Sequence, residues 1–164
     1  MRSLPGMDAI ALLTQQHEET EILFQQVAVA TGEDRARLFR LLARMLTLHT
    51  LLEERHFYPA VKVAETEDLL LHSFDDHAES KALISQMIHL DINDMQFEPA
   101  LVRLRASVEA HVAEERSILF PLVRKLFSDE DLQRLGAELA RRTDELAQPG
   151  ALPTVSSENQ LGVF

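Results

Sequence analysis

Apolar residues recur every three or four positions along most of the chain, which is the period of an α-helix with one buried face. The first such stretch begins at Met7 and should fade near Thr31-Gly32, where glycine can end a helix. A histidine lies in the middle of its expected buried stripe. That stripe is Ile10, Leu13, His17, Phe24 and Val27.

The second stretch begins near Glu33-Asp34, because acidic residues suit the positive N-terminal end of a helix dipole. Pro59 has no backbone N–H, so this helix should end or kink near Phe57-Tyr58. Its expected stripe again contains polar residues. The stripe is Leu38, Leu42, Met45 or Leu46, His49, Glu53, and His56 or Phe57.

A third helix should begin at Thr66-Glu67-Asp68 and close at residues 91–94, and a fourth should open at Phe97-Glu98-Pro99. The third stripe is Leu70, Phe74, His77, Ile84 and Ile88, and the fourth is Leu101, Leu104, Val108, His111, Glu115, Ile118 and Leu122. Ser128 and the acidic residues after it predict the cap of a fifth, shorter helix, which should end near Leu146.

No stretch alternates between apolar and polar residues as a strand would. We therefore predict an all-α fold, an up-down-up-down four-helix bundle with a short additional C-terminal helix. The bundle domain should cover residues 1–147, with its core at 7–127. Residues 148–164 begin with Gln-Pro-Gly and should form a flexible C-terminal tail.

Composition narrows the possible functions. The 164 residues suit one domain, and the absence of cysteine excludes disulfides, thiolate-bound zinc, iron–sulfur clusters and cysteine nucleophiles. The net charge of −11 argues against nucleic-acid partners and anionic membranes. No apolar run reaches the roughly 18 residues of a membrane span. We expect a soluble cytoplasmic protein.

Four histidines and two glutamates lie on the expected buried stripes of four separate helices. Two His-x3-Glu pairs are 62 residues apart, and two lone histidines are 60 residues apart. A spacing of four residues points the imidazole and the carboxylate of each pair the same way. Two similar helical hairpins would bring all six side chains to the axis of the bundle. The six residues are His17, His49, Glu53, His77, His111 and Glu115.

A metal centre explains why these polar groups lie on apolar faces. Without a counter-ion, burying two carboxylates and four imidazoles would cost roughly several kcal/mol per charge. Six ligands suit two ions bridged by two carboxylates, and a sulfur-free shell of imidazole and carboxylate favours iron or manganese over calcium or magnesium. The alternative is a metal-free helical interaction module with ordinary core histidines.

At these residues the chain resembles the hemerythrin-like proteins, specifically the HHE cation-binding domains, over roughly residues 7–127. The resemblance implies a four-helix bundle that holds a non-haem di-iron centre, with the two glutamates as bridging carboxylates and the four histidines as terminal ligands. The matching residues are His17, His49-x3-Glu53 with Tyr58-Pro59, His77, and His111-x3-Glu115 with Phe120-Pro121.

Two departures separate the chain from the oxygen carriers of that family. The carriers have a further histidine where this chain has Ser73, and their last carboxylate follows its histidine by five residues, whereas Glu115 follows His111 by four. The chain is therefore more similar to the bacterial HHE proteins than to the respiratory carriers.

We expect two non-haem iron ions, oxo- or hydroxo-bridged, in preference to manganese or zinc. They would bind or react with a small oxidant (dioxygen, hydrogen peroxide or nitric oxide), with catalase-like peroxide or nitric oxide chemistry as one form of this function. The alternative is a non-enzymatic iron or oxygen sensor whose fold responds to metal occupancy. The fifth helix and the tail would then be the responding element.

Several polar residues near these ligands have weaker assignments. Glu21 and Lys81, each four residues after a lone histidine, should pair across the bundle or else extend into solvent. Tyr58 should pack near the proline. The residues expected on solvated or outer positions are Glu18, Glu19, Glu54, His56, His72, His89 and Glu114.

Overall fold

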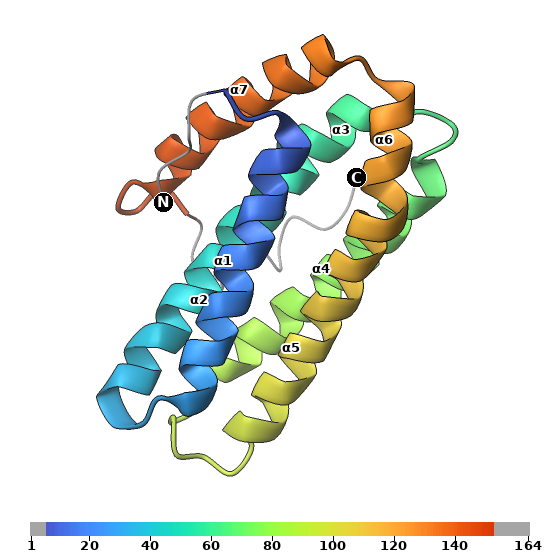
Figure 1. Cartoon of the computed structure of the whole chain (residues 1–164). Coiled ribbons are helices and arrows are strands. Elements are labelled where there is room, and N and C mark those ends of the chain that lie inside the picture. The colour runs from blue at the N-terminus through green and yellow to red at the C-terminus, as the bar shows by residue number, and fades with distance from the viewer. Residues whose placement is uncertain (1–5, 153–164) are drawn as a thin grey trace.

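The computed structural model describes residues 6–152, and these contain helices but no strand. The α-helices are α1 (Ala9–Val29), α2 (Gly32–Leu52), α3 (Tyr58–Val61), α4 (Glu67–Met87), α5 (Phe97–Glu114), α6 (Phe120–Leu126) and α7 (Asp129–Ala147). Two π-helical turns, η1 (Glu53–Phe57) and η2 (Glu115–Leu119), join α2 to α3 and α5 to α6. The predicted all-α fold is confirmed: α1, α2–η1–α3, α4 and α5–η2–α6 are the four long helices of the bundle (Figure 1).

Local sequence explains where the helices begin. Asp8 caps α1, because its carboxylate accepts a 2.9 Å hydrogen bond from the backbone N–H of Ala11. Ser128 caps α7 in the same way by accepting from the N–H of Asp131. Gly32 has φ of +57° and so allows the sharp reversal between α1 and α2.

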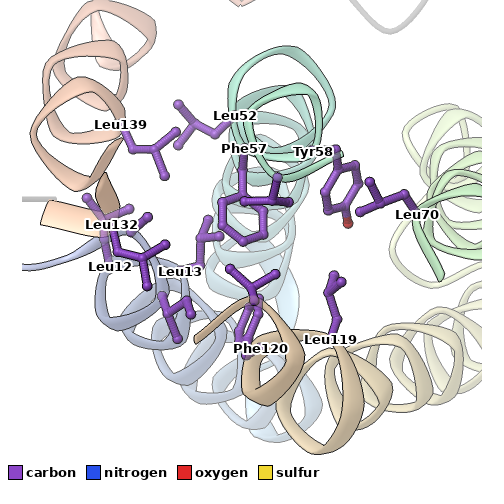
Figure 2. Packing of buried hydrophobic residues seen from close by; sticks show 14 of the residues in the cluster. Leu12, Leu13, Leu52, Phe57, Tyr58, Leu70, Leu119, Phe120, Leu132 and Leu139 are labelled. Carbon is purple, nitrogen blue, oxygen red and sulfur yellow. The ribbon is translucent and has the colours of Figure 1, made fainter. Parts of the chain in front are cut away.

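The apolar core consists of two clusters of buried residues. The first lies near the start of α1, where α3, α6 and α7 meet (Figure 2). Its buried members include Leu12, Leu13, Leu52, Phe57, Tyr58, Leu70, Leu119, Phe120, Leu132 and Leu139. The second cluster lies toward the other end of the bundle, with members that include Phe24, Phe39, Leu42, Leu83, Met87, Phe97 and Leu104. The polar side chains of four helices meet between the two clusters.

The π-turns change which residues face the core. In η1 the N–H of Tyr58 bonds to the carbonyl of Glu53, five residues back, and Phe120 bonds to Glu115 in the same way in η2. Each turn thus takes one residue more than an α-helical turn. The sequence predicts that this helix ends or kinks near Phe57-Tyr58; it does not end there, because the chain stays helical past Pro59 to the end of α3, but the regular α-helix is interrupted by η1 at Glu53–Phe57.

The extra residue in each turn corrects the predicted stripes. Leu119 is buried and Ile118 is 49% exposed, because η2 moves the buried face on by one position. Phe57 rather than His56 is buried after η1 for the same reason. Phe74 is also partly exposed and packs edge-on against Tyr58 from outside, and Ile88 is partly exposed because α4 ends one residue earlier.

Helix α7 lies across the bundle against α1 and α2 (Figure 1). It has 19 residues, fewer than the 21 of α1, so the predicted fifth, shorter helix that follows Ser128 and ends near Leu146 is confirmed. Gly136 allows the close contact: a Cβ there would lie 2.2 Å from the backbone oxygen of Met7. Backbone atoms rather than flexible side chains fill that space.

The start of the predicted tail contacts the rest of the domain. The guanidinium of Arg44 donates to the carbonyl oxygen of Ala147 at 2.6 Å and approaches that of Gln148, the first tail residue, at 3.5 Å, and Leu152 packs against the first apolar cluster. The remainder of that predicted segment, 153–164, lies outside the described residues. Within the described part of the chain, no helix has the length and apolar composition needed to cross a bilayer.

Candidate metal centre

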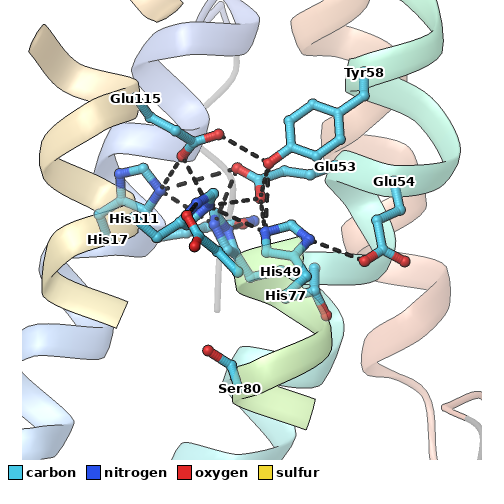
Figure 3. Close-up of polar contacts among 12 residues, drawn as sticks. His17, His49, Glu53, Glu54, Tyr58, His77, Ser80, His111 and Glu115 are labelled. Atoms are coloured by element: carbon cyan, nitrogen blue, oxygen red, sulfur yellow. Dashed lines mark hydrogen bonds and ion pairs between the residues drawn. The ribbon is translucent and has the colours of Figure 1, made fainter. Parts of the chain in front are cut away.

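The structure brings all six predicted ligand residues together between the two apolar clusters (Figure 3). Each is at most 5% exposed. α1, α4 and α5 each contribute a histidine, and α2 contributes the fourth, while both glutamates begin the π-turns. The set is His17, His49, Glu53, His77, His111 and Glu115. Sequence periodicity thus located every side chain of this buried cluster.

Glu53 lies between two pairs of histidines. Its Oε1 is 3.1 Å from Nε2 of His49 and 4.0 Å from Nε2 of His17. Its Oε2 is 3.1 Å from Nε2 of His77 and 3.9 Å from Nε2 of His111. One carboxylate oxygen therefore faces each pair, which is the arrangement that a carboxylate shared by two cations requires.

Within each pair the two imidazole nitrogens converge. Nε2 of His17 and Nε2 of His49 are 3.1 Å apart, and the same atoms of His77 and His111 are also 3.1 Å apart. Two nitrogens bound to one ion by bonds of about 2.0–2.1 Å at a right angle lie roughly 3 Å apart. The spacing of both pairs fits a shared cation.

Glu115 offers one oxygen to both histidine pairs. Its Oε2 is 3.2 Å from Nε2 of His17 and 3.5 Å from Nε2 of His111. Its Oε1 accepts a 3.0 Å hydrogen bond from the hydroxyl of Tyr58. Glu115 thus adds a second carboxylate to the centre, but it presents a single oxygen to the histidines where Glu53 presents two.

Several atoms of this cluster have unmet polar requirements. Oε1 of Glu53 and Oε2 of Glu115 make no hydrogen bond among residues 6–152, although less than 1 Å² of each atom is accessible. A buried acceptor without a partner costs free energy. A positive ion at each histidine pair would satisfy both oxygens, so the donor set fits a pair of metal ions.

Tyr58 contributes an oxygen that the sequence alone did not assign to the centre. Its hydroxyl oxygen lies 3.1 Å from Oε2 of Glu53 and 3.0 Å from Oε1 of Glu115, so its one proton can be donated to either carboxylate, and it lies 3.4 Å from Nε2 of His77. Burial raises the pKa of Tyr58 well above its ordinary value, and the charges of both glutamates raise it further. The residue packs in the core as predicted, and it also holds a proton between the two carboxylates.

A partly buried carboxylate, that of Glu54, orients His77. Nδ1 of this imidazole lies 2.9 Å from Oε1 of Glu54, and Nζ of Lys81 contacts both oxygens of that glutamate at 2.8–2.9 Å. The prediction that Glu54 is a solvated residue is wrong, because the turn of η1 points it toward α4. A histidine ligand held by a carboxylate is a better electron donor to a metal ion.

The other histidines have different partners. Nδ1 of His49 lies 2.7 Å from Oε1 of Gln16, a neutral amide that is itself buried. Nδ1 of His111 lies 3.4 Å from Oδ2 of Asp76, and Nδ1 of His17 makes no hydrogen bond within residues 6–152. Gln16 and Asp76 adjoin ligands in sequence, which is the only signal that could have pointed to them.

The predicted pair of Glu21 with Lys81 is wrong. Lys81 contacts Glu54 instead, and Glu21 accepts from Arg105 on α5. Glu114 is likewise not simply solvated, because its Oε2 lies 2.6 Å from Nδ1 of His72. These partners belong to other helices, so the spacing along one helix could not identify them.

Charge in the metal-free cluster is distributed unevenly. Burial lowers the pKa of His17 to about 4. Burial also lowers that of His77, but hydrogen bonds and charges from Glu53 and Glu54 outweigh burial and raise it to about 9. Burial together with the charge of Glu53 raises the pKa of Glu115 to about 7. Protons thus partly neutralise the carboxylates in the absence of a cation.

The chain is similar to a curated protein and to a solved structure. A DNA nickase of Nostoc sp. (strain PCC 7120 / SAG 25.82 / UTEX 2576) is 24% identical over 138 residues, which are 84% of this chain and 39% of that protein. The crystal structure of a hemerythrin HHE cation binding domain-containing protein from Mycobacterium kansasii has a TM-score of 0.77 at 22% identity. That match covers 85% of this chain and 87% of the other.

A protein family also matches the part of the chain that builds the centre. Residues 8–123, from the cap of α1 into α6, match the hemerythrin HHE cation binding domain. The match includes every residue of the buried histidine and glutamate cluster, and the solved structure shares the helical fold. On these grounds the chain belongs to the hemerythrin HHE cation-binding domain family.

Proposed function

We propose that the chain binds two non-haem iron ions and uses them to bind or react with dioxygen, hydrogen peroxide or nitric oxide. The observation that carries this proposal is the position of Glu53, whose two oxygens face different histidine pairs. His17 and His49 would hold one ion, and His77 and His111 the other. The family resemblance implies iron, and a shell of imidazole and carboxylate ligands without sulfur suits it.

A bound iron pair would supply redox equivalents and open coordination positions for a small molecule. The protein's own residues shape the site. Phe120 stacks on His17 with ring centroids 5.9 Å apart, and Tyr58 stacks on His77 at 5.6 Å. These rings limit the access of water to the ligands and restrict the space to a small molecule.

Tyr58 also holds the proton nearest to the centre. Its hydroxyl lies within 3.1 Å of both carboxylates and can donate to either one. A neutral phenol in this place can stabilise negative charge that develops on a bound oxidant. Tyr58→Phe would keep the ring packing and remove only this donor.

Steady-state peroxide consumption by iron-loaded protein tests the enzymatic form of the proposal. Peroxide chemistry is supported if wild type consumes peroxide continuously and Tyr58→Phe, at the same iron content, consumes it more slowly. Nitric oxide and dioxygen are tested by changes in the absorption bands of the same protein. An iron-loaded protein whose spectrum does not respond to any of the three molecules would contradict the proposal.

A second candidate function is an iron or oxygen sensor, and a contact between the ligands and α7 favours it. Gln16 touches His49, and its Nε2 also approaches Oγ1 of Thr143 on α7 at 3.5 Å. Metal occupancy that turns the His49 ring would therefore affect the docking of α7. Faster hydrogen exchange in α7 after chelation, without peroxide turnover, would favour the sensor.

We do not extend the activity named for the Nostoc relative to this chain. The chain spans 39% of the length of that protein. Its net charge of −11 disfavours a phosphate backbone, and several arginines pair with carboxylates on neighbouring turns or helices. A gel-shift assay with duplex and single-stranded DNA should give no shifted band at physiological salt, and a band would contradict this view.

A further inference from the structure

A second group of possible metal ligands lies outside the buried centre, where α4 and α5 face each other. Nδ1 of His72 is 2.6 Å from Oε2 of Glu114 and 3.9 Å from Oδ2 of Asp76. Ligand atoms of all three residues lie within 4.8 Å of one another. The side chain of His72 is 59% exposed, and those of Asp76 and Glu114 are 24% and 28% exposed. This cluster can exchange ions with solvent, unlike the buried centre.

The sequence around this cluster supplies little positive charge. Neither residues 63–80 nor residues 106–115 contain a lysine or an arginine, although both segments are rich in acids. Among the described residues, the ion-pair partners of Asp76 and Glu114 are histidines. By contrast, another carboxylate of α5 does have an arginine partner, because Glu109 pairs with Arg105. Within residues 6–152 these two carboxylates therefore have only histidines as cationic partners, and an external cation could bind them.

A buried nitrogen also points into the cluster. Nδ1 of His111 lies 3.4 Å from Oδ2 of Asp76 and makes no hydrogen bond among residues 6–152. His111 is only 5% exposed. Asp76 thus stands between the surface histidine His72 and a ligand of the buried centre. Its Oδ2 is the oxygen nearest to both imidazoles, so a cation held by Asp76 at the surface would lie close to a ligand of the buried centre.

We propose that His72, Asp76 and Glu114 form a surface site for a divalent transition-metal cation, and that this site captures cations destined for the buried centre. One imidazole and two carboxylates suit Fe²⁺, Mn²⁺ or Zn²⁺, which bind nitrogen and oxygen together. Ligands around such an ion lie roughly 3–4.4 Å apart. Exposed side chains can rotate to that spacing from the present one. The capture role rests on the proposed function, but the surface site itself does not.

Titration with Mn²⁺ tests the site, because free Mn²⁺ gives a sharp magnetic-resonance signal that binding removes. The full chain is first loaded with iron, and its iron content is measured. We expect wild type to take up about one further Mn²⁺ ion. His72→Ala and Glu114→Gln should each weaken this binding about ten-fold or more, as loss of a direct ligand requires.

Two exposed residues provide matched controls. His89→Ala removes another surface histidine, and Glu79→Gln removes one negative charge from an exposed position of α4. Neither should change Mn²⁺ affinity by more than about two-fold. If the controls weaken binding as much as the site variants do, general surface charge holds the ion and the proposed site is wrong. Unchanged affinity in His72→Ala would also overturn it.

The rate at which iron fills the buried centre tests whether the surface site captures cations for it. Metal-free wild type and His72→Ala are mixed with Fe²⁺ in aerated buffer, where dioxygen oxidises the bound iron, and the growth of near-ultraviolet absorption is followed. We expect slower filling in His72→Ala with the same final iron content. Equal rates would overturn capture. If wild type binds no iron, the proposed function is contradicted. The difference in Mn²⁺ binding between wild type and His72→Ala would still show whether the surface site exists.

Discussion

Single side chains next to the ligands set the properties of the two histidine pairs. His77 has a carboxylate, Glu54, on its Nδ1, whereas His49 has the neutral amide of Gln16 there. Lys81 holds Glu54 in place. A carboxylate behind an imidazole makes it a stronger metal ligand. The two histidine pairs therefore have chemically different surroundings even though the helices that carry them are similar.

Glu54→Gln should weaken iron binding at the His77 position. The substitution keeps the shape of the side chain but removes the charge that makes the imidazole more basic, so we expect a loss of about 10–100-fold in affinity. Competition with a coloured chelator measures it. Glu79→Gln, which makes the same change on an exposed side chain of α4, should leave affinity unchanged. Equal affinity in wild type and Glu54→Gln would show that Glu54 does not support His77.

The metal-free protein should lose stability as the pH rises from 7 to 9. Folding raises the pKa of His77 from 6.5 to about 9, so within this window the folded state holds a proton that the unfolded chain has released. Below pH 6.5 the proton on His77 stabilises the folded state. This contribution to the free energy of unfolding, at most ~3 kcal/mol, is lost as the pH rises to 9. Metal-loaded protein should show no such loss, because a metal ion replaces the proton.

Urea unfolding at pH 7 and pH 9, with and without metal, measures this difference. The midpoint should fall with pH in the metal-free sample alone. A midpoint of the metal-free protein that rises over this range, or falls equally in both samples, would mean that His77 does not keep its proton in the folded state.

At the scale of elements, the π-turns determine which residues line the centre. Each turn begins at a glutamate of the cluster, and the aromatic residue that follows the turn, Tyr58 or Phe120, packs beside a histidine. The sequence showed the helices, their buried faces and the His-x3-Glu pairs, because the α-helical period holds up to each glutamate. It could not show the residues buried beyond Glu53 and Glu115, because a π-turn has no periodic signature.

The contact of α7 with the start of α1 depends on the lack of a side chain at Gly136. A Cβ there would lie within 2.8 Å of three backbone atoms of residues 7–9. Gly136→Ala should therefore lower the free energy of unfolding by roughly 1–3 kcal/mol, because backbone atoms cannot rotate away. Gln133→Ala, at an exposed position of the same helix, should change it by less than about 0.5 kcal/mol. Urea unfolding of both variants compares them, and an unaffected Gly136→Ala would mean that α7 docks less closely.

At the scale of the whole molecule, a polar layer divides the hydrophobic core. The two apolar clusters stabilise the ends of the bundle, while the buried carboxylates and imidazoles between them are costly without a cation. Metal binding and stability should therefore be linked. Sequence periodicity was enough to predict this layer and its six residues, since they lie on the apolar stripes. The supporting contacts from Gln16, Glu54 and Asp76 depend on how helices pack, which one-dimensional spacing does not contain.

Iron content combined with Mössbauer spectroscopy tests the central claim, that Glu53 is shared by two iron ions. Wild type reconstituted with iron should hold about two ions per chain, magnetically coupled through their bridges. Glu53→Gln should lose the coupled pair, while Glu18→Gln, an exposed glutamate on α1 paired with Arg116, should keep it. One ion or none in wild type, or a coupled pair that persists in Glu53→Gln, would contradict the account.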